Sequence, residues 1–231
     1  NKKTLNNIIT NINSNFKNQS NSLSVTINND DVLISSIKIN SVKNNQKIIN
    51  WYESKVMGES FCDNYYNYYF PMESNNDCLL ISLPKKIKDN ILNSSKELGF
   101  NLVYLSVGIF SAAALAKQLY KKETKKEHLI WKICKNNHHL LVYYNNDKIK
   151  SFIKFKSNAK EVIPEVSIGS EKDHKKIKSI ICNILLKNNI DDKFENIFIY
   201  QTKENNDLIK KILKSNPNNI KVLDFSRLIK S

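Results

Sequence analysis

Four cysteines are the first residues that could carry chemistry, as metal ligands, as nucleophiles or in disulfides. Cys62, Cys78, Cys134 and Cys182 are scattered along the chain, and no two of them form a Cys-x-x-Cys pair. None has a histidine partner in a zinc-ligand pattern. We therefore favour buried or unreactive thiols in a reducing cytoplasm over a metal site or disulfides.

Carboxylates and histidines offer no catalytic constellation. A two-metal nuclease needs several carboxylates that converge on the metal ions, and the strand expected over Leu129–Cys134 carries none. Asp191 and Asp192 precede a later strand without partners, so we interpret them as a turn. His138 and His139 are adjacent, so in a strand they face opposite sides and do not share a metal.

Glycines, which nucleotide-binding loops need, are scarce. Backbone amides approach phosphate oxygens closely only where no side chain intervenes. No two glycines are adjacent and none lies in a G-x-x-x-x-G-K pattern. Ser111 also lacks the flanking glycines of a hydrolase nucleophile elbow. The four glycines are Gly58, Gly99, Gly108 and Gly169. We therefore expect an interaction protein and not an enzyme.

The formal net charge of +14 over 231 residues would suit neutralisation of nucleic-acid phosphates. Of the 36 basic residues, however, only Arg227 is an arginine, the residue that contacts guanine by paired hydrogen bonds. Lys, Asn and Ile are abundant together, and A/T-rich codons encode all three. Because genome composition explains much of the charge, we favour a solvated basic surface over a nucleic-acid site.

Hydrophobic spacing in the first quarter of the chain predicts a helix, two strands and a second helix. The apolar residues of Leu5–Phe16 recur at helical spacing. Leu23–Ile27 and Val32–Ile39 alternate apolar and polar residues, and the Asn and Asp residues between them predict a tight hairpin. Lys47–Met57 is the second helix. No apolar run reaches the roughly 20 residues of a membrane-spanning helix.

An aromatic cluster between Phe61 and Phe70 is the most unusual local feature. It is interpreted either as a strand whose alternate rings line a core edge, which we favour, or as a docking surface. Amphipathic aromatic rings dominate the energetically important positions of protein interfaces. The candidate partner-binding residues are Tyr65, Tyr66, Tyr68, Tyr69 and Phe70.

A regular alternation of strands and helices begins near Asp77. Cys78–Leu83 predicts a short buried strand, and Pro84 suits the first turn of a helix that runs to Leu98. Gly99 then ends this helix as a C-cap glycine. The next elements are a strand over Phe100–Val107 and an alanine-rich helix over Ile109–Tyr120.

Three apolar runs in the second half predict an antiparallel meander. They are His128–Cys134, His139–Tyr144 and Lys148–Phe155, separated by turn-forming Asn-Asn pairs. A polar loop containing Pro164 and Gly169 should follow. The remaining elements are a helix over Lys175–Lys187, a strand over Asn196–Tyr200, a helix over Asn206–Leu213, a strand over Ile220–Leu223 and a last short helix.

The element order of the second half is the ribonuclease H-like topology, and Asp77–Tyr120 looks like the last half of a second copy. Two such units in tandem make the actin-like fold, so we predict an α/β, actin-like chain. The first subdomain should cover residues 1–120, incomplete at its N-terminus and with a small inserted subdomain over about 1–70. A linker over 121–127 should lead to the second subdomain over 128–231.

Several short stretches resemble the actin-like proteins of type IV pilus and type II secretion assembly, of the PilM and GspL kind. Asn50–Glu53 (Asn-Trp-Tyr-Glu) precedes the tyrosine-containing segment, and Leu79–Lys86 is a strand ending in Pro-Lys-Lys. Glu97–Leu102 matches the family's helix end, and Phe110–Ala112 opens its alanine-rich helix. The likeness covers Ser22–Ser231.

The resemblance implies that the family's nucleotide site is degenerate here. The chain would begin after the first three strands of the family's first subdomain, which removes the first phosphate loop. The second phosphate loop would place Lys132 and Cys134 where the family has Asp and Gly. The adenosine-side Gly-Gly would fall on Gln201 and Thr202. We therefore expect no ATP hydrolysis, no ATP binding and no cofactor.

The leading hypothesis is a non-catalytic cytoplasmic scaffold, peripheral to the inner membrane, that docks on inner-membrane proteins of a pilus or secretion machine. The resemblance implies that the partner is a short cytoplasmic tail of a membrane protein. A basic face could add attraction to anionic lipid headgroups, at about 1 kcal/mol per well-placed lysine. The alternatives are a nucleic-acid-binding protein with a ribonuclease H-like core, and an ATPase whose phosphate loop lies upstream of Asn1.

Overall fold

The computed structural model of the chain describes residues 21–38, 45–73, 77–158, 160–186, 195–200, 206–215 and 220–223. The chain divides into two compact units. The first unit comprises Asn1–Ile34, Lys43–Tyr69 and Leu80–Gly108, and the second comprises Ser35–Val42, Phe70–Leu79 and Ile109–Ser231. The helix expected over Leu5–Phe16 and the last short helix lie outside the described residues.

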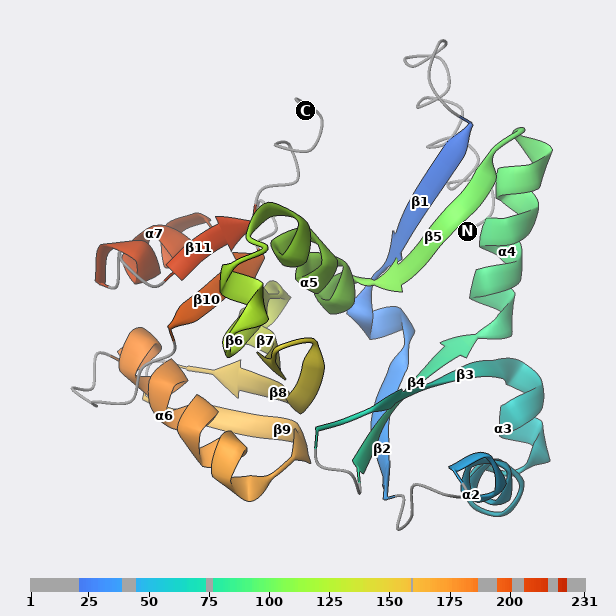
Figure 1. Cartoon of the computed structure of the whole chain (residues 1–231), viewed down its shortest axis with the longest axis horizontal. Coiled ribbons are helices and arrows are strands. Elements are labelled where there is room, and N and C mark those ends of the chain that lie inside the picture. Colours follow the sequence, from blue (N-terminus) through green and yellow to red (C-terminus); the bar gives the residue numbers. More distant parts are fainter. Residues whose placement is uncertain are drawn as a thin grey trace. The chain divides into compact units, whose positions relative to one another are not determined.

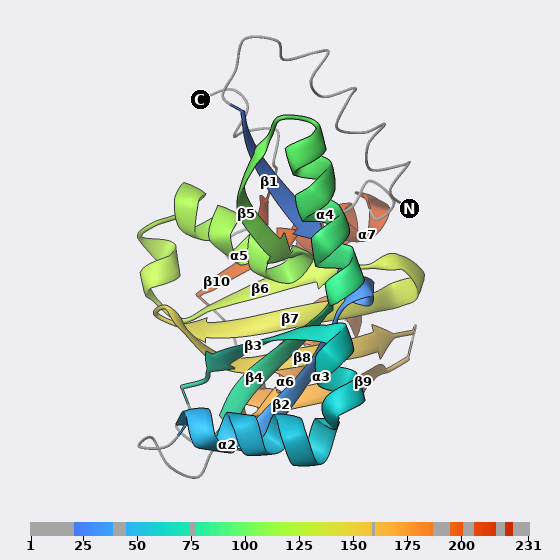
Figure 2. The ribbon, with the colours of Figure 1, turned by 90° about the vertical axis from the view of Figure 1, so that its right-hand side faces the viewer.

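A six-stranded sheet organises the second unit. Its strands are β6 (His128–Ile133), β7 (His138–Asn145), β8 (Lys148–Ser157), β9 (Val162–Gly169), β10 (Asn196–Tyr200) and β11 (Ile220–Leu223). The strand order is β11-β10-β6-β7-β8-β9. β10 pairs with β6 and β11 in parallel, whereas β6 to β9 form an antiparallel meander. Figures 1 and 2 show this meander with its strands side by side.

This arrangement confirms the predicted ribonuclease H-like order, with one correction. Residues 162–169, predicted as a polar loop around Pro164 and Gly169, form a fourth meander strand, β9. A bulge lies opposite the pair Lys154 and Phe155, whose partners are Val166 and Pro164. Proline is tolerated in edge strands and beside bulges, where the missing N–H costs no ladder hydrogen bond. The presence of Pro164 therefore led to the incorrect prediction of a loop.

Both faces of this sheet are covered, and for that reason β6 is buried along its whole length. Leu129, Trp131 and Ile133 pack in one core with α6 (Glu171–Leu186) and α7 (Asn206–Ser215). On the other face, the ring of Phe198 lies 5.3 Å from that of Tyr120, which follows α5 (Gly108–Leu119). A strand buried on both faces is expected to be apolar throughout instead of alternating.

Helix α6 presents a clear apolar stripe to this core. Its buried residues Ile177, Ile180, Ile181 and Ile184 follow the spacing of one helix face. The start is fixed by Ser170, whose Oγ accepts a hydrogen bond from the backbone N–H of Asp173 at 3.1 Å. The hydroxyl in turn donates to the Asp173 carboxylate at 2.6 Å, which is the geometry of a capped helix N-terminus.

In the first unit, β1 (Ser22–Ile27) and β5 (Asn101–Val107) form a two-stranded parallel sheet. The predicted hairpin between β1 and β2 (Leu33–Lys38) is therefore wrong. A tight hairpin turn needs positive φ angles, but Asn28 is extended and Asn29–Asp31 forms a single 3-10 turn with Asn29 buried. The chain leaves β1 without reversing, so β2 joins a different sheet.

That other sheet has three strands in the order β2-β4-β3, with β3 spanning Tyr65–Pro71 and β4 spanning Asp77–Pro84. The remaining helical elements of the described residues are α2 (Asn45–Tyr52), a π-helix (Glu53–Met57), α3 (Glu59–Asn64), α4 (Lys85–Glu97) and two 3-10 turns (Glu123–Lys125 and Lys135–Asn137). Gly99, predicted to end α4, has φ +75° and so confirms its role as a left-handed C-cap residue. Among the residues that the structure describes, no helix combines the length and apolarity that a membrane crossing requires.

Candidate functional site

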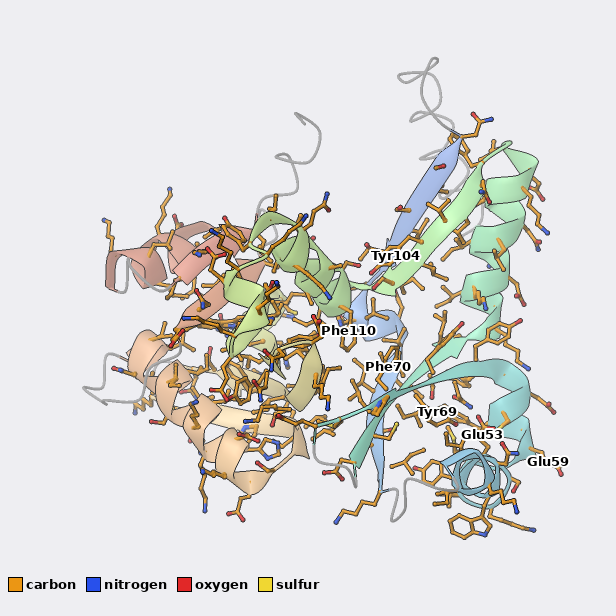
Figure 3. All side chains as sticks on the ribbon, viewed as in Figure 1. Glu53, Glu59, Tyr69, Phe70, Tyr104 and Phe110 are labelled. Atoms are coloured by element: carbon orange, nitrogen blue, oxygen red, sulfur yellow. The ribbon has the colours of Figure 1, made fainter. Side chains whose placement is uncertain are left out.

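Strand β3 carries the candidate aromatic residues, and its pleat divides them between two faces. On one face, the Tyr69 hydroxyl donates to Oε1 of Glu53 at 2.6 Å, and the side-chain amide of Asn67 donates to the same oxygen at 3.1 Å. Figure 3 shows Tyr69 and Glu53 directed toward one another. The Asn67 carbonyl oxygen accepts from Ser82 of β4 at 2.7 Å. The first two bonds hold the half-buried Glu53 carboxylate, which forms no ion pair with any residue that the structure describes.

The π-helix explains why Glu53 can reach β3. The backbone N–H of Gly58 bonds to the carbonyl of Glu53 at 3.0 Å, five residues earlier in the chain. One-turn π segments of this kind frequently occur at functional positions, where they redirect a side chain. The ring of Tyr65 stacks on Phe61 of α3 with a centroid separation of 4.3 Å. This face of β3 is therefore held against the α2–α3 region.

The opposite face of β3 contacts α4. The ammonium of Lys88 lies 4.2 Å from the ring centroid of Tyr66 and donates a hydrogen bond to the hydroxyl of Tyr68 at 3.1 Å. The Tyr66 hydroxyl bonds to Asp89 at 3.3 Å. Cation–π contacts at such partly exposed sites contribute about 0.5–1 kcal/mol. The tyrosines on this face are thus half-buried and engaged with a basic helix.

Phe70 differs from the four tyrosines. Its side chain is 41% exposed, and its ring stacks on that of Phe110 with a centroid separation of 6.1 Å. Both rings are labelled in Figure 3. Of the candidate partner-binding residues, Phe70 offers the most open apolar surface, and the use of all five in docking stays a prediction.

The positions that the resemblance assigned to the phosphate loop lie at the end of β6. Lys132 is buried, with Nζ 6.0 Å from the ring centroid of Tyr200, and Cys134 is partly buried just beyond the strand. In the following turn, Asn136 and Asn137 have φ angles of 55° and 57°, the left-handed conformation that asparagine tolerates. Gln201 and Thr202 lie outside the described residues.

Two histidines of β7 face opposite sides of the sheet, as the sequence predicts. His138 lies 3.3 Å from the Glu165 carboxylate. His139 is fully buried and accepts the indole N–H of Trp131 at Nδ1 (3.1 Å) while its Nε2 lies 2.9 Å from Oγ of Ser157. Burial, aided by the neighbouring His138, lowers the pKa of His139 to about 4. His139 is therefore a neutral core residue. No group of His, Cys, Asp and Glu residues suited to a metal ion occurs within the described part of the chain.

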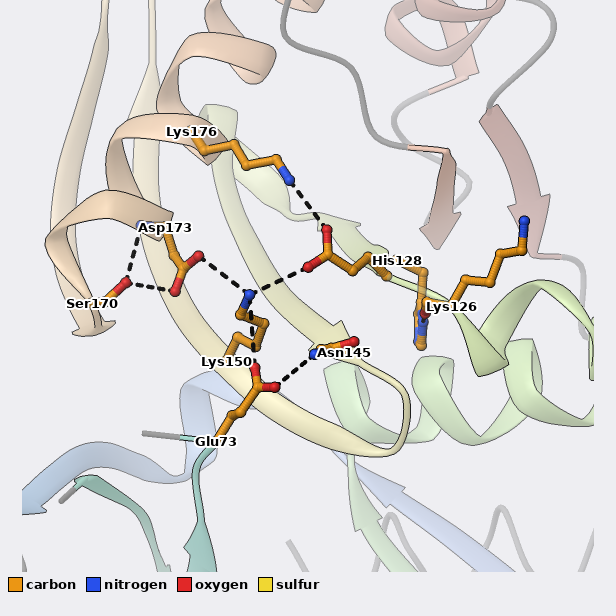
Figure 4. A network of polar contacts seen from close by, with 9 residues as sticks. Glu73, Lys126, His128, Asn145, Lys150, Ser170, Asp173 and Lys176 are labelled. Atoms are coloured by element: carbon orange, nitrogen blue, oxygen red, sulfur yellow. Dashed lines mark hydrogen bonds and ion pairs between the residues drawn. The ribbon is translucent and has the colours of Figure 1, made fainter. Parts of the chain in front are cut away.

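A polar network around Lys150 of β8 was not foreseen from the sequence. Its ammonium lies 3.3 Å from Glu127, 3.7 Å from Glu73 and 3.7 Å from Asp173. Figure 4 shows the carboxylates of Glu73 and Asp173 converging on it. Lys176 of α6 adds a second cation 3.2 Å from Glu127. The network ties the segment after β3 to β8 and α6 within the second unit.

Electrostatics within this network favour the charged forms. Burial would raise the pKa of Glu127, but hydrogen bonds from Tyr143 and Lys176 outweigh it and lower the pKa. Burial would likewise lower the pKa of Lys150, yet the surrounding carboxylates, Asp173 foremost, raise it. No sequence signal marks Lys150, because its three carboxylate partners come from segments far apart in the chain. The network is better suited to holding structure together than to catalysis.

No protein-family model matches the chain, and comparison with curated proteins finds no relative. The chain is similar in structure to a chain of the PilM–PilN type IV pilus biogenesis complex, with 11% identity and a TM-score of 0.60, over 96% of this chain and 74% of that one.

Two further solved structures resemble the chain less closely. One is the cytoplasmic domain of EpsL, an inner membrane component of the type II secretion system of Vibrio cholerae, with 8% identity, 83% and 66% coverage and a TM-score of 0.42. The other is a Bacteroides thetaiotaomicron protein with an actin-like ATPase fold, with 9% identity, 92% and 75% coverage and a TM-score of 0.36. TM-scores this low add no support.

The sheet order and the likeness at a TM-score of 0.60 define an α/β protein of the actin-like fold. The fold implied by the resemblance to actin-like pilus proteins is therefore confirmed.

Proposed function

We propose that this chain is a non-catalytic cytoplasmic scaffold that docks on inner-membrane proteins of a type IV pilus or type II secretion assembly machine. The observation that carries the proposal is the likeness of its fold, over 96% of its length, to a chain of the PilM–PilN type IV pilus biogenesis complex. The name of that complex describes two proteins assembled together. A docking role is the function that this fold then supports best.

The end of β6 supports the non-catalytic part of the proposal. A magnesium-bound nucleotide needs an acidic residue to hold the water shell of the metal ion. At the position where the resemblance expects this acidic residue, the chain has the buried residue Lys132, and a cation there opposes a divalent metal ion. The turn that follows holds Asn136 and Asn137, whose side chains occupy space that a glycine would leave open to phosphate.

The geometry of β3 supports the docking part. β3 is an outer strand of its sheet, and outer strands are common sites for the addition of a peptide strand. Its tyrosine hydroxyls and the exposed ring of Phe70 supply the mixed polar and apolar surface that interfaces favour. The net charge of +14 adds attraction to anionic lipid headgroups at a membrane surface.

The test is direct binding of the full chain to fluorescent peptides that cover the cytoplasmic tails of inner-membrane proteins encoded beside it. We expect one tail to bind, and Phe70→Ala to weaken binding at least fivefold, because an interface aromatic ring contributes more than about 1 kcal/mol. Tyr104→Ala is the matched control, since Tyr104 is 43% exposed on β5. Failure of every tail to bind, or equal loss in both variants, would count against the proposal.

A salt titration separates this function from the nucleic-acid alternative. The full chain should bind a 20-nucleotide DNA only at low ionic strength, because binding that depends on counterion release weakens steeply with salt. Binding that persists at about 0.15 M salt would favour a nucleic-acid-binding protein with a ribonuclease H-like core.

A further inference from the structure

The outer edge of β9 is open in the second unit. β9 ends the six-stranded sheet, and along this edge it pairs with none of the strands that the structure describes. Ile163 exposes 45% of its surface there. An edge strand presents a row of backbone donors and acceptors to any chain that can lie beside it. Edge proline and a bulge, both present in β9, limit but do not abolish such pairing.

An apolar pocket adjoins this edge, between β9 and α6. Its volume is about 120 Å³, close to the roughly 150 Å³ of a protein cavity that holds one benzene molecule. The walls are formed largely by apolar side chains, including Phe155, Val162, Pro164, Ile177 and Ile181. The pocket therefore has room for one aliphatic or aromatic side chain.

One polar atom in the wall has no partner. Nε2 of His174, which lines the pocket, is buried and makes no hydrogen bond in the described part of the chain. A buried polar atom left without a hydrogen bond carries a free-energy cost. A ligand that brings a hydrogen-bonding group beside its apolar side chain would remove that cost.

Charge at the pocket mouth favours an acidic ligand. Lys175 and Lys178 line it, and Lys175 is paired with Glu171 at 2.7 Å. Lys178 is exposed and has no ion pair with any carboxylate among the described residues. Two copies of this chain, each with a net charge of +14, would repel one another at such a surface.

We propose that β9 and this pocket form a docking site for an extended acidic segment of a partner protein. The segment adds as a strand along the outer edge of β9 and inserts one bulky apolar side chain between β9 and α6. A carboxylate of the segment pairs with Lys178, and a polar group beside the apolar side chain satisfies His174. This site uses no residue of the aromatic strand and does not depend on the proposed function.

The experiment selects binders from a display library of random ten-residue peptides on the immobilised full chain, so that no ligand need be known. We expect enriched peptides to share one bulky apolar residue flanked by acidic residues. Ser167→Phe, at an exposed serine that lines the pocket, should fill it and weaken their binding at least tenfold. Ser60→Phe, at an exposed serine of α3, should leave it unchanged.

Lys178→Glu supplies a second measurement on the same peptides. The proposal pairs Lys178 with a carboxylate of the bound peptide. Reversing the charge of this exposed side chain should therefore weaken binding about three- to fivefold at physiological salt. The proposal is overturned if no peptide is enriched, or if the enriched peptides bind Ser167→Phe and the parent chain equally. It is also overturned if light scattering shows a dimer that Ser167→Phe dissociates, because the occupant would then be a second copy.

Discussion

Acidification from pH 7.5 to pH 5 should destabilise the chain through one buried histidine. His139 is fully buried, and its Nδ1 accepts the indole N–H of Trp131 at 3.1 Å. Nδ1 therefore carries no proton, and the proton on Nε2 is donated to Ser157 at 2.9 Å. If Nδ1 were protonated, its N–H and the indole N–H of Trp131 would face one another as two donors. Because the site is fully buried, water could not separate them.

The size of the effect follows from the pKa of His139. Burial lowers this pKa from 6.5 to about 4 in the folded chain. Between pH 6.5 and pH 4, the unfolded chain therefore binds a proton at His139 that the folded chain does not bind. The contribution of neutral His139 to the free energy of unfolding is complete above about pH 6.5. It is lost as the pH falls toward 4. The loss should be about 2 kcal/mol at pH 5 and about 3 kcal/mol below pH 4.

The assay is urea unfolding at half-unit steps from pH 7.5 to pH 4, followed by tryptophan fluorescence. His139→Gln removes the titrating group, so subtracting the two stability curves cancels the contributions of other groups. His128, whose pKa is also lowered by burial, is one of these. A difference curve that is flat between pH 6.5 and pH 4 would refute the reasoning, as would an NMR titration of His139 with a midpoint near 6.5.

Three substitutions test other parts of the structure by urea unfolding. Gly169→Ala should cost several kcal/mol, since φ is +118° and a Cβ would collide with the backbone of Lys150, whereas Gly99→Ala, with open space around it, should cost about 1 kcal/mol. Tyr69→Phe should cost about 1 kcal/mol by removing a hydrogen bond to a carboxylate, while Tyr104→Phe should be neutral. Lys150→Met should destabilise by about 1–3 kcal/mol, because three carboxylates lose their shared cation. Equal costs within either matched pair, or a neutral Lys150→Met, would contradict these assignments.

Local patterns were sufficient to predict most of the second unit. The apolar runs of β6, β7 and β8 and the periodic isoleucines of α6 produce strong signals because both faces of the sheet are covered. The asparagine turns between these strands were also predictable, since Asn136 and Asn146 adopt the positive φ that asparagine tolerates.

Elements that depend on distant partners were not predictable. Asn28 and its neighbours favour a hairpin by composition, yet β1 pairs with β5, almost eighty residues later in the chain. The strand propensity of the local residues does not reveal a pairing with such a distant segment. Pro164 masked β9 because a proline is excluded only from central strands, and the sequence does not reveal which strand lies at the edge.

The strand that carries the aromatic candidate residues was predictable in part, and its use in docking stays a prediction. The sequence allowed either a strand or an exposed patch over Phe61–Phe70, and the structure has helix α3 up to Asn64 and strand β3 from Tyr65. The alternation of a strand explains why Tyr66 and Tyr69 have different partners. The hydrogen bonds to Glu53 depend on a π-helix that no composition signal predicts. The Lys150 network was missed for a similar reason, because its carboxylates are adjacent only in the folded chain.

Titration of the full chain with magnesium and ATP in a calorimeter tests the central claim most directly. With Lys132 buried at the end of β6, we expect no saturable, magnesium-dependent heat up to about 1 mM ATP, a concentration at which even binding worth about 4 kcal/mol would register. Saturable binding of magnesium and ATP with a micromolar dissociation constant would contradict a scaffold that acts by docking alone.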